Sequence, residues 1–345
     1  MVVSENNRKF AIGKQRLGIM VETNNRRLPV GIQSFEEIRK DGYLYVDKTD
    51  IIWQLANRNK KYNYLSRPRR FGKSVLVDTL EAYFLGKKEL FEGLKIMQME
   101  TEWVKRPVIR LDMSLAGAAP ESVRSYLDNA FHQLESEYDV AVRQDSSLAD
   151  RFDAIIQTAY NKTGLQVAIL IDEYDAPLLD VVHEENQLVA LRQILRNFFS
   201  PLKDSDSMLH FVFLTGITKF SQLSIFSELN NITNISMLPE YAGICGITKE
   251  EMLTRLKEGI QELAEAKNWT MDETLSRLKD YYDGYHFASE SPDIFNPFSL
   301  LSSLSLKRVE PFWFSTGTPT YLINMMRKYE FLPADLGEAI EVGKK

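Results

Sequence analysis

The segment Gly72-Lys73-Ser74 restricts the possible folds of this chain more than any other feature. It follows an apolar stretch at 62–66 that is typical of a strand, and apolar residues then recur on one helical stripe from Lys73 to a C-capping Gly86. A strand that turns through a glycine into a helix presents backbone N–H groups and the positive end of the helix dipole to an anion. The sequence therefore predicts a phosphate-binding loop at 67–74.

The residues of this loop are the expected nucleotide-binding residues. They are Arg67, Pro68, Arg69, Arg70, Phe71, Gly72, Lys73 and Ser74. Gly72 lets the backbone approach the phosphates, Lys73 neutralises β- and γ-phosphate oxygens, and Ser74 offers its hydroxyl to Mg²⁺. Standard loops of this type begin with glycine, where this chain has Arg67. The alternative is a basic surface turn, but three arginines within four residues beside a strand end favour an anion site.

A second strand, expected at 167–171, runs directly into Asp172 and Glu173. Such a strand delivers acids to the carboxyl edge of a parallel sheet, where Asp172 would hold Mg²⁺ through its waters and Glu173 would act as general base. An adjacent glutamate favours an ATPase over a GTPase. The alternative is a solvated acidic turn, and Asp175 is interpreted as a helix cap.

The strand expected at 210–215 ends in a polar turn. Thr215 or Thr218 is a candidate sensor of the γ-phosphate, with an ordinary turn as the equal alternative. Arg192 and Arg196 are candidates for an arginine finger toward a neighbouring subunit, although a solvated helix face is favoured for both. Arg69 and Arg70 are candidates for a phosphate clamp within the same chain.

Strands alternate with helices up to Gly246, which predicts an α/β fold with a parallel sheet and helices on both faces. Further strands are expected at 43–46, 108–113 and 231–236, and Asp47 is expected to cap a helix. Helices follow Gly246, among them one from the capping box at Thr248 to Ala266 and one after Asn296-Pro297. The predicted units are a weakly ordered extension (1–28), an α/β domain (29–246) and a helical domain (247–345). Met20 is a candidate natural start.

The composition excludes several classes of protein. The net charge of −6 argues against a generally basic coat for nucleic acid, and one cysteine excludes an internal disulfide. The four histidines are scattered without metal-ligand spacing. No apolar run is long enough to cross a bilayer, and no secretory signal is present. We therefore expect a cytoplasmic protein without a membrane partner.

Taken together, the motifs resemble the AAA-ATPase-like family of bacterial and archaeal proteins. The matching stretches are 45–49, 67–74, 171–175, 224–227, 282–287 and 296–299. The resemblance implies that arginine is usual at position 67, that Asp47 and Lys48 lie near the nucleotide, and that a helical, winged-helix-like lid follows Gly246. Members often carry a C-terminal PD-(D/E)XK nuclease-like domain. Few residues follow Tyr329 and they hold no such constellation, so we expect that domain to be absent from this chain.

The expected function is ATP binding, with Mg²⁺-dependent hydrolysis coupled to movement of the lid. Lys73, Glu173 and Thr215 are the predicted catalytic residues, and Ser74 and Asp172 the predicted metal site. The absence of a guanine-reading N-K-x-D segment favours ATP over GTP. The alternative is a non-hydrolysing, nucleotide-binding regulatory module for a nuclease-like domain or a partner. A protein partner or a homo-oligomer is compatible with either function. A nucleic-acid partner is suggested by the family resemblance alone.

Overall fold

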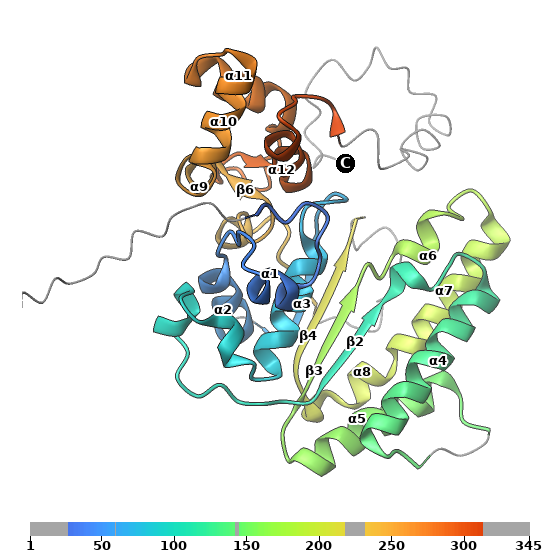
Figure 1. Cartoon of the computed structure of the whole chain (residues 1–345). Helices are drawn as coiled ribbons and strands as arrows, with labels where there is room; N and C mark the ends of the chain where they lie inside the picture. The colour runs from blue at the N-terminus through green and yellow to red at the C-terminus, as the bar shows by residue number, and fades with distance from the viewer. Residues whose placement is uncertain (1–26, 59, 142–144, 218–231, 313–345) are drawn as a thin grey trace, which may run out of the picture.

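A five-stranded parallel sheet forms the centre of the computed structural model, which describes residues 27–58, 60–141, 145–217 and 232–312 (Figure 1). The strands are β1 (Tyr62–Ser66), β2 (Val108–Asp112), β3 (Val167–Asp172), β4 (Leu209–Gly216) and β5 (Thr233–Asn234). Their order across the sheet is β2-β3-β4-β1-β5. All neighbouring strands are parallel, so the turns after β1, β3 and β4 meet at one edge.

Helices cover both faces of the sheet, as predicted. One face carries α4 (Pro120–Tyr138), α5 (Leu148–Thr163), α6 (Ala176–Leu179), α7 (Glu185–Phe199) and α8 (Pro201–Asp204). The other carries α1 (Phe35–Lys40), α2 (Thr49–Arg58), α3 (Lys73–Phe84) and the short 3₁₀ turns η1 (Lys88–Phe91) and η2 (Lys95–Gln98). Every residue of β3 is buried, and successive side chains enter opposite cores: Ile169 packs with α4 and α5, and Leu170 with α3.

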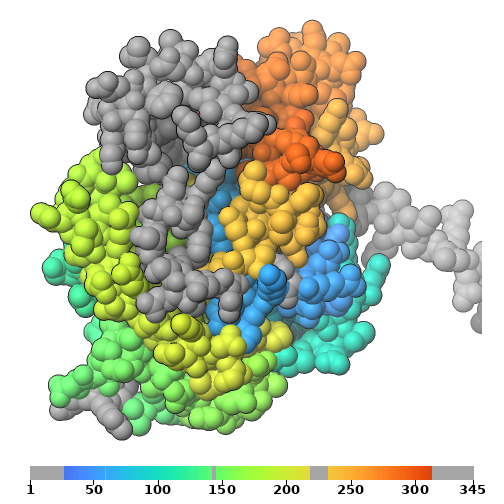
Figure 2. Space-filling view, turned by 180° about the vertical axis from the view of Figure 1, so that it is seen from behind, coloured from blue at the N-terminus to red at the C-terminus, as the bar shows by residue number. Residues whose placement is uncertain are grey.

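A separate apolar cluster holds together the part of the chain after Gly246, here called the C-terminal unit (residues 247–312). Its elements are β6 (Ile247–Thr248), α9 (Lys249–Arg255), α10 (Lys257–Lys267), α11 (Met271–Tyr282), β7 (Ile294–Phe295) and α12 (Pro297–Leu306). β6 and β7 form an antiparallel ribbon. The unit stands beyond the carboxyl edge of the sheet and is visible in orange in Figure 2.

Most of the expected strands and helices are confirmed, including the capping box of Thr248 and the cap of Asn296. The helix expected from Thr248 to Ala266 is instead two helices that meet at Leu256. The ribbon of β6 and β7 was not anticipated, because two-residue strands leave no periodic signal.

The strand expected at 43–46 is wrong, since these residues pair with no other strand in the described structure. Their alternation is nevertheless real. Tyr45 packs against the core around α3, whereas Leu44 and Val46 pack against the cluster of the C-terminal unit. The segment lies between two apolar clusters, so alternate side chains face opposite ways as they would in a sheet.

Further expectations fall on residues outside the described ranges: Met20 as a start, residues 1–26 of the extension, Thr218 and the motif at 224–227. Among the helices that the structure describes, none combines the length and apolar character needed to cross a membrane.

Candidate nucleotide site

The predicted phosphate loop leads from the end of β1 into α3. Gly72 is the N-cap of α3 and has φ of 89°, a left-handed conformation that a residue with a side chain rarely adopts. Its backbone therefore provides the open approach to the helix N-terminus that an anion requires. The loop residues from Pro68 to Ser74 line a cavity of about 670 Å³, a size typical of small-molecule sites.

The other walls of the cavity come from distant parts of the chain. Pro29, Ile32 and Leu44 contribute an apolar wall from the N-terminal segment. Ile247, Pro297, Phe298 and Leu301 contribute a second from the C-terminal unit. A charged loop facing apolar walls suits a ligand with an anionic end and a flat, weakly polar end.

Lys73 and Glu173 meet where β1 and β3 end. The Nζ atom of Lys73 lies 3.5 Å from Oε1 of Glu173 and donates to the carbonyl oxygens of Arg67 and Pro68 at 3.2 Å each. The Lys73 side chain is 2% exposed, and that of Glu173 is 24% exposed and lines the cavity. Burial raises the pKa of Glu173, and Asp172 and Asp175 add to the rise, while Lys73 opposes it.

Asp172 and Thr215 lie side by side because β4, rather than β2, separates β3 from β1. The Thr215 hydroxyl donates to Oδ1 of Asp172 and accepts from the backbone N–H of Glu173 at 3.1 Å. Both side chains are buried, and neither is among the described residues that line the cavity. Thr215 therefore holds the acidic strand end in place, and its sensor role stays a prediction.

The sequence predicts Arg67 as a phosphate ligand, but the structure directs its side chain away from the cavity. Its guanidinium donates to the carbonyl oxygens of Ser66, Ser236 and Tyr241 and lies 3.8 Å from the ring centre of Phe287. The residue is 1% exposed and is not among the described residues that line the cavity. Burial lowers the pKa of Arg67 to about 10, which leaves it charged at neutral pH. Arg67 thus anchors the loop to neighbouring carbonyl groups and to Phe287, on the side away from the cavity.

The resemblance implies that Asp47 and Lys48 lie near the nucleotide. In the structure, the two side chains point in different directions. Asp47 accepts from the backbone N–H and hydroxyl of Thr49 and from the N–H of Lys95, so its carboxylate joins α2 to η2. Lys48 lines the cavity, and its ammonium bonds Glu251 of α9.

Asp175 occupies the N-cap position of α6, as interpreted from the sequence, but its side chain does not cap the helix. It makes no capping hydrogen bond to α6, and Oδ2 instead accepts from the N–H of Ile217 at 2.9 Å. A Cβ at Gly216 would come within 2.8 Å of the Asp175 carboxylate, so glycine is needed for this close approach. Asp175 therefore ties the turn after β3 to the end of β4.

Arg192 and Arg196 lie on α7, half-buried, and neither is among the described residues that line the cavity. Their assignment to an arginine finger stays a prediction.

Sequence reasoning missed the contacts between the loop and the C-terminal unit. The Phe71 ring is fully buried against Tyr285 and Phe287, at centroid distances of 4.6 and 5.5 Å. The Arg70 guanidinium lies 4.2 Å from the ring centre of Phe298. The signal was the aromatic-rich motif at 282–287, but no local pattern states which surface such rings cover.

The donor set fits a magnesium nucleotide. The described residues contain no cluster of three or more His, Cys, Asp or Glu side chains that could hold a metal alone. Mg²⁺ bound with substrate phosphates needs fewer protein ligands, usually one or two oxygens and water. Ser74 at the cavity and Asp172 behind it supply oxygens of that kind.

Residues 29–226 match the family described as "AAA-ATPase_like: Predicted AAA-ATPase". The chain belongs to this AAA-ATPase-like family. It is 36% identical over 318 residues to an "Uncharacterized protein in vnfD 5'region" of Azotobacter chroococcum mcd 1, covering 90% of this chain and 58% of that protein. The chain therefore spans little more than half the length of this relative.

Two solved structures are also similar. Cdc6p from Pyrobaculum aerophilum has a TM-score of 0.35 and 13% identity, covering 76% of this chain and 62% of that one. The Aeropyrum pernix ORC1 protein, solved in complex with DNA, has a TM-score of 0.31 and 11% identity, covering 81% and 66%. These likenesses are too distant to assign a partner or a ligand to this chain.

Proposed function

We propose that this member of the AAA-ATPase-like family binds and hydrolyses Mg·ATP in the cavity between the sheet and the C-terminal unit. The observation that carries the proposal is the meeting of Lys73 and Glu173, 3.5 Å apart at the edge of a cavity bordered by a helix N-terminus. A buried lysine can neutralise phosphate oxygens, and a carboxylate whose pKa is raised by burial can act as a general base.

Each residue has a distinct task in this proposal. The N-terminus of α3 and Lys73 hold the phosphates, and Ser74 and Asp172 hold Mg²⁺, which when bound neutralises charge on the phosphate oxygens. Glu173 orients a water and accepts its proton. Thr215 keeps Asp172 and the Glu173 backbone in place through its two hydrogen bonds. The apolar walls at Ile32, Leu44 and Ile247 hold the adenine base of ATP.

Thermal unfolding with and without Mg·ATP tests nucleotide binding. Ligand at 100-fold above Kd stabilises the folded state by about 2.7 kcal/mol, a shift of several degrees. We expect this shift in the unsubstituted chain and its loss in Lys73→Ala. If neither chain shifts, the site does not bind ATP under these conditions, and the proposal is wrong.

The second candidate is a regulatory module that binds ATP without hydrolysing it. It is favoured by the rigid fastening of the loop, in which Arg67 and Phe71 are buried against the C-terminal unit and neighbouring carbonyls. The variant Glu173→Gln separates the two candidates. An ATPase should lose about 10²- to 10⁴-fold in turnover while it keeps nucleotide affinity. Undetectable turnover in the unsubstituted chain, with intact binding, would select the regulatory module.

A further inference from the structure

An ion pair joins the C-terminal unit to the segment before α2 at the wall of the cavity. The Lys48 ammonium, just before α2, donates to both carboxylate oxygens of Glu251 on α9, at 2.6 and 2.5 Å. The two residues are 203 positions apart. Their side chains are 9% and 22% exposed, so water screens this pair much less than the pairs on the protein surface.

Other contacts hold the Glu251 carboxylate and the backbone on both sides of Lys48. Glu251 is the third residue of α9 and closes its capping box, in which Oε2 accepts the backbone N–H of Thr248 at 2.8 Å. Lys48 lies between Asp47, whose carboxylate is bonded on both sides, and Thr49, which is fully buried. The carboxylate is therefore fixed at a helix start, and the backbone that carries Lys48 is fixed beside α2.

The electrostatic surroundings explain why Lys48 needs this partner. It shares the cavity wall with Lys73, Arg69 and Arg70. Burial lowers the pKa of Lys48, Lys95 adds to the lowering, and Glu251 and Cys245 act in the opposite direction. A buried ammonium among other cations keeps its charge and its position best with an anion beside it.

We propose that Glu251 is a positioning residue for nucleotide binding, which holds the Lys48 ammonium at the cavity wall for the phosphates. The proposal rests on the proposed function. It makes the C-terminal unit a part of the nucleotide site, because Glu251 belongs to that unit and Lys48 does not. Glu251 is not itself among the described residues that line the cavity.

The same unit supplies a matched control. α11 begins with a second capping box in which Glu273 Oε2 accepts the N–H of Thr270 at 2.8 Å, as Glu251 accepts that of Thr248. Glu273 has no lysine partner among the described ion pairs. Glutamine keeps the capping oxygen in both boxes. Glu251→Gln loses the ion pair with Lys48, whereas Glu273→Gln has no such pair to lose.

The experiment measures Mg·ATP affinity, KM and kcat on the intact chain, after thermal unfolding without nucleotide has shown that each variant is folded. We expect Glu251→Gln to weaken affinity by about tenfold, equivalent to about 1.4 kcal/mol. KM should rise while kcat stays within about twofold of the unsubstituted value, since Glu173 and Lys73 are untouched. Glu273→Gln should leave affinity unchanged.

Three further variants test whether loss of the ion pair causes the weaker affinity: Lys48→Arg, Lys48→Gln, and Lys48→Gln combined with Glu251→Gln. Lys48→Arg keeps the charge and should retain affinity. Glu251→Gln should have no further effect in a Lys48→Gln background, because the two residues act as one unit. Equal affinities of Glu251→Gln and Glu273→Gln, or additive losses in the double variant, would overturn the inference alone. Absence of Mg·ATP binding by the unsubstituted chain would overturn the proposed function and the inference with it.

Discussion

The backbone conformation at Glu173 supports the role of general base that we propose for this residue. Its φ of 48° is left-handed, an uncommon and strained conformation for a residue with a long side chain. The strain is held by the hydrogen bonds around it, since its N–H donates to Thr215 and the next N–H, of Tyr174, donates to the Thr215 carbonyl at 2.9 Å. The turn directs the carboxylate toward Lys73.

The pH dependence of turnover should report Glu173. A general base must be ionised, and burial raises the pKa of this carboxyl from its usual 4.5. Turnover should therefore be present above the raised pKa and be lost as pH falls through it, with an acid limb at higher pH than an ordinary glutamate gives. A kcat profile in saturating Mg·ATP measures this limb. A flat profile down to pH 4.5 would contradict it.

Stability should respond with the opposite sign. The folded chain binds the Glu173 proton more tightly than the unfolded chain does. Glu173 therefore stabilises the fold least at a pH where its carboxyl is ionised in both the folded and the unfolded chain. Its contribution falls as pH rises from 4.5 through the raised pKa. The melting temperature of Glu173→Gln should therefore rise relative to that of the unsubstituted chain as pH increases from 4.5 through the raised pKa. This measurement is the control that the acid limb of turnover belongs to Glu173.

At the scale of elements, the phosphate loop is shaped as much by what packs behind it as by its own residues. Arg67, Arg70 and Phe71 each contact an aromatic ring of the C-terminal unit. The backbone N–H of Gly246 donates to the Phe71 carbonyl at 3.1 Å. The loop, the segment before β6 and the aromatic motif at 282–287 therefore form one packed group.

Gly246 is the position where this group tolerates least change. Its φ is 86°, and an added Cβ would lie 2.2 Å from Ile294 Cγ2 and 3.0 Å from Phe71 Cε1. We expect Gly246→Ala to cost about 1–2 kcal/mol for the left-handed backbone and about 1–3 kcal/mol for overpacking. Because Phe71 must move, nucleotide affinity should fall as well.

Denaturant unfolding and Mg·ATP titration measure the two effects. Gly243→Ala is the matched control, since its Cβ would meet nothing closer than Thr248 Cγ2 at 3.7 Å. A Gly246→Ala variant that loses stability but binds Mg·ATP with unchanged affinity would show that the loop does not depend on this packing.

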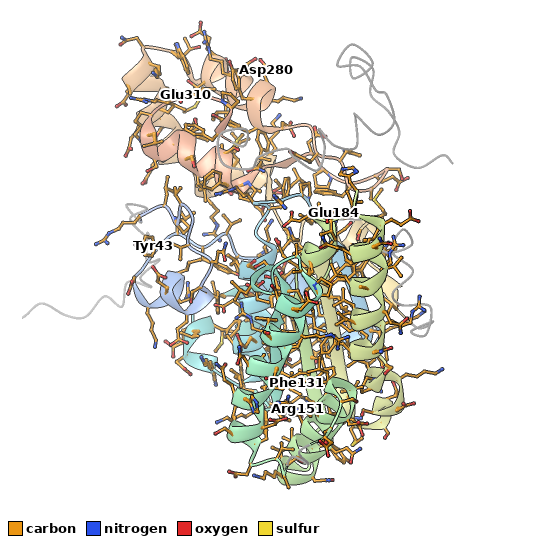
Figure 3. The ribbon with its side chains drawn as sticks, turned by 90° about the vertical axis from the view of Figure 1, so that its right-hand side faces the viewer. Tyr43, Phe131, Arg151, Glu184, Asp280 and Glu310 are labelled. Carbon is orange, nitrogen blue, oxygen red and sulfur yellow. The ribbon has the colours of Figure 1, made fainter. Side chains whose placement is uncertain are left out.

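The whole molecule contains separate apolar cores with different relations to the site. The core around α4, α5 and α7 lies on the face of the sheet opposite α3. Figure 3 shows Phe131 and Arg151 of this core region far from Asp280 and Glu310 of the C-terminal unit. Phe152 stacks against Phe131 and against Phe198, with ring centres 5.5 and 5.0 Å away, and the rings of Phe131 and Phe198 lie 6.0 Å from each other.

Phe152→Leu should therefore reduce stability without affecting nucleotide binding. The loss of volume and of two stacked contacts should cost about 1–3 kcal/mol. Mg·ATP affinity, measured well below the melting temperature, should match that of the unsubstituted chain. A changed affinity would mean that this core and the cavity are coupled across the sheet.

Features that depend on neighbours along the chain were predictable from the amino-acid sequence. The strand, glycine turn and helix at 62–84 were predictable because Gly72-Lys73-Ser74 sits between two periodic patterns. The acidic end of β3 and the caps at Thr248 and Asn296 were predictable for the same reason, since each rests on contacts within a few residues. The family resemblance drew on these local motifs.

The contacts between distant residues could not be predicted in this way, because they depend on the packing of whole elements. The placement of β4 beside β3 brought Thr215 to Asp172, and the folding of the C-terminal unit over the sheet turned Arg67 away from the cavity and brought Lys48 to Glu251. These contacts join residues tens to hundreds of positions apart. They depend on how whole elements pack, and packing between distant elements leaves no periodic trace in either segment.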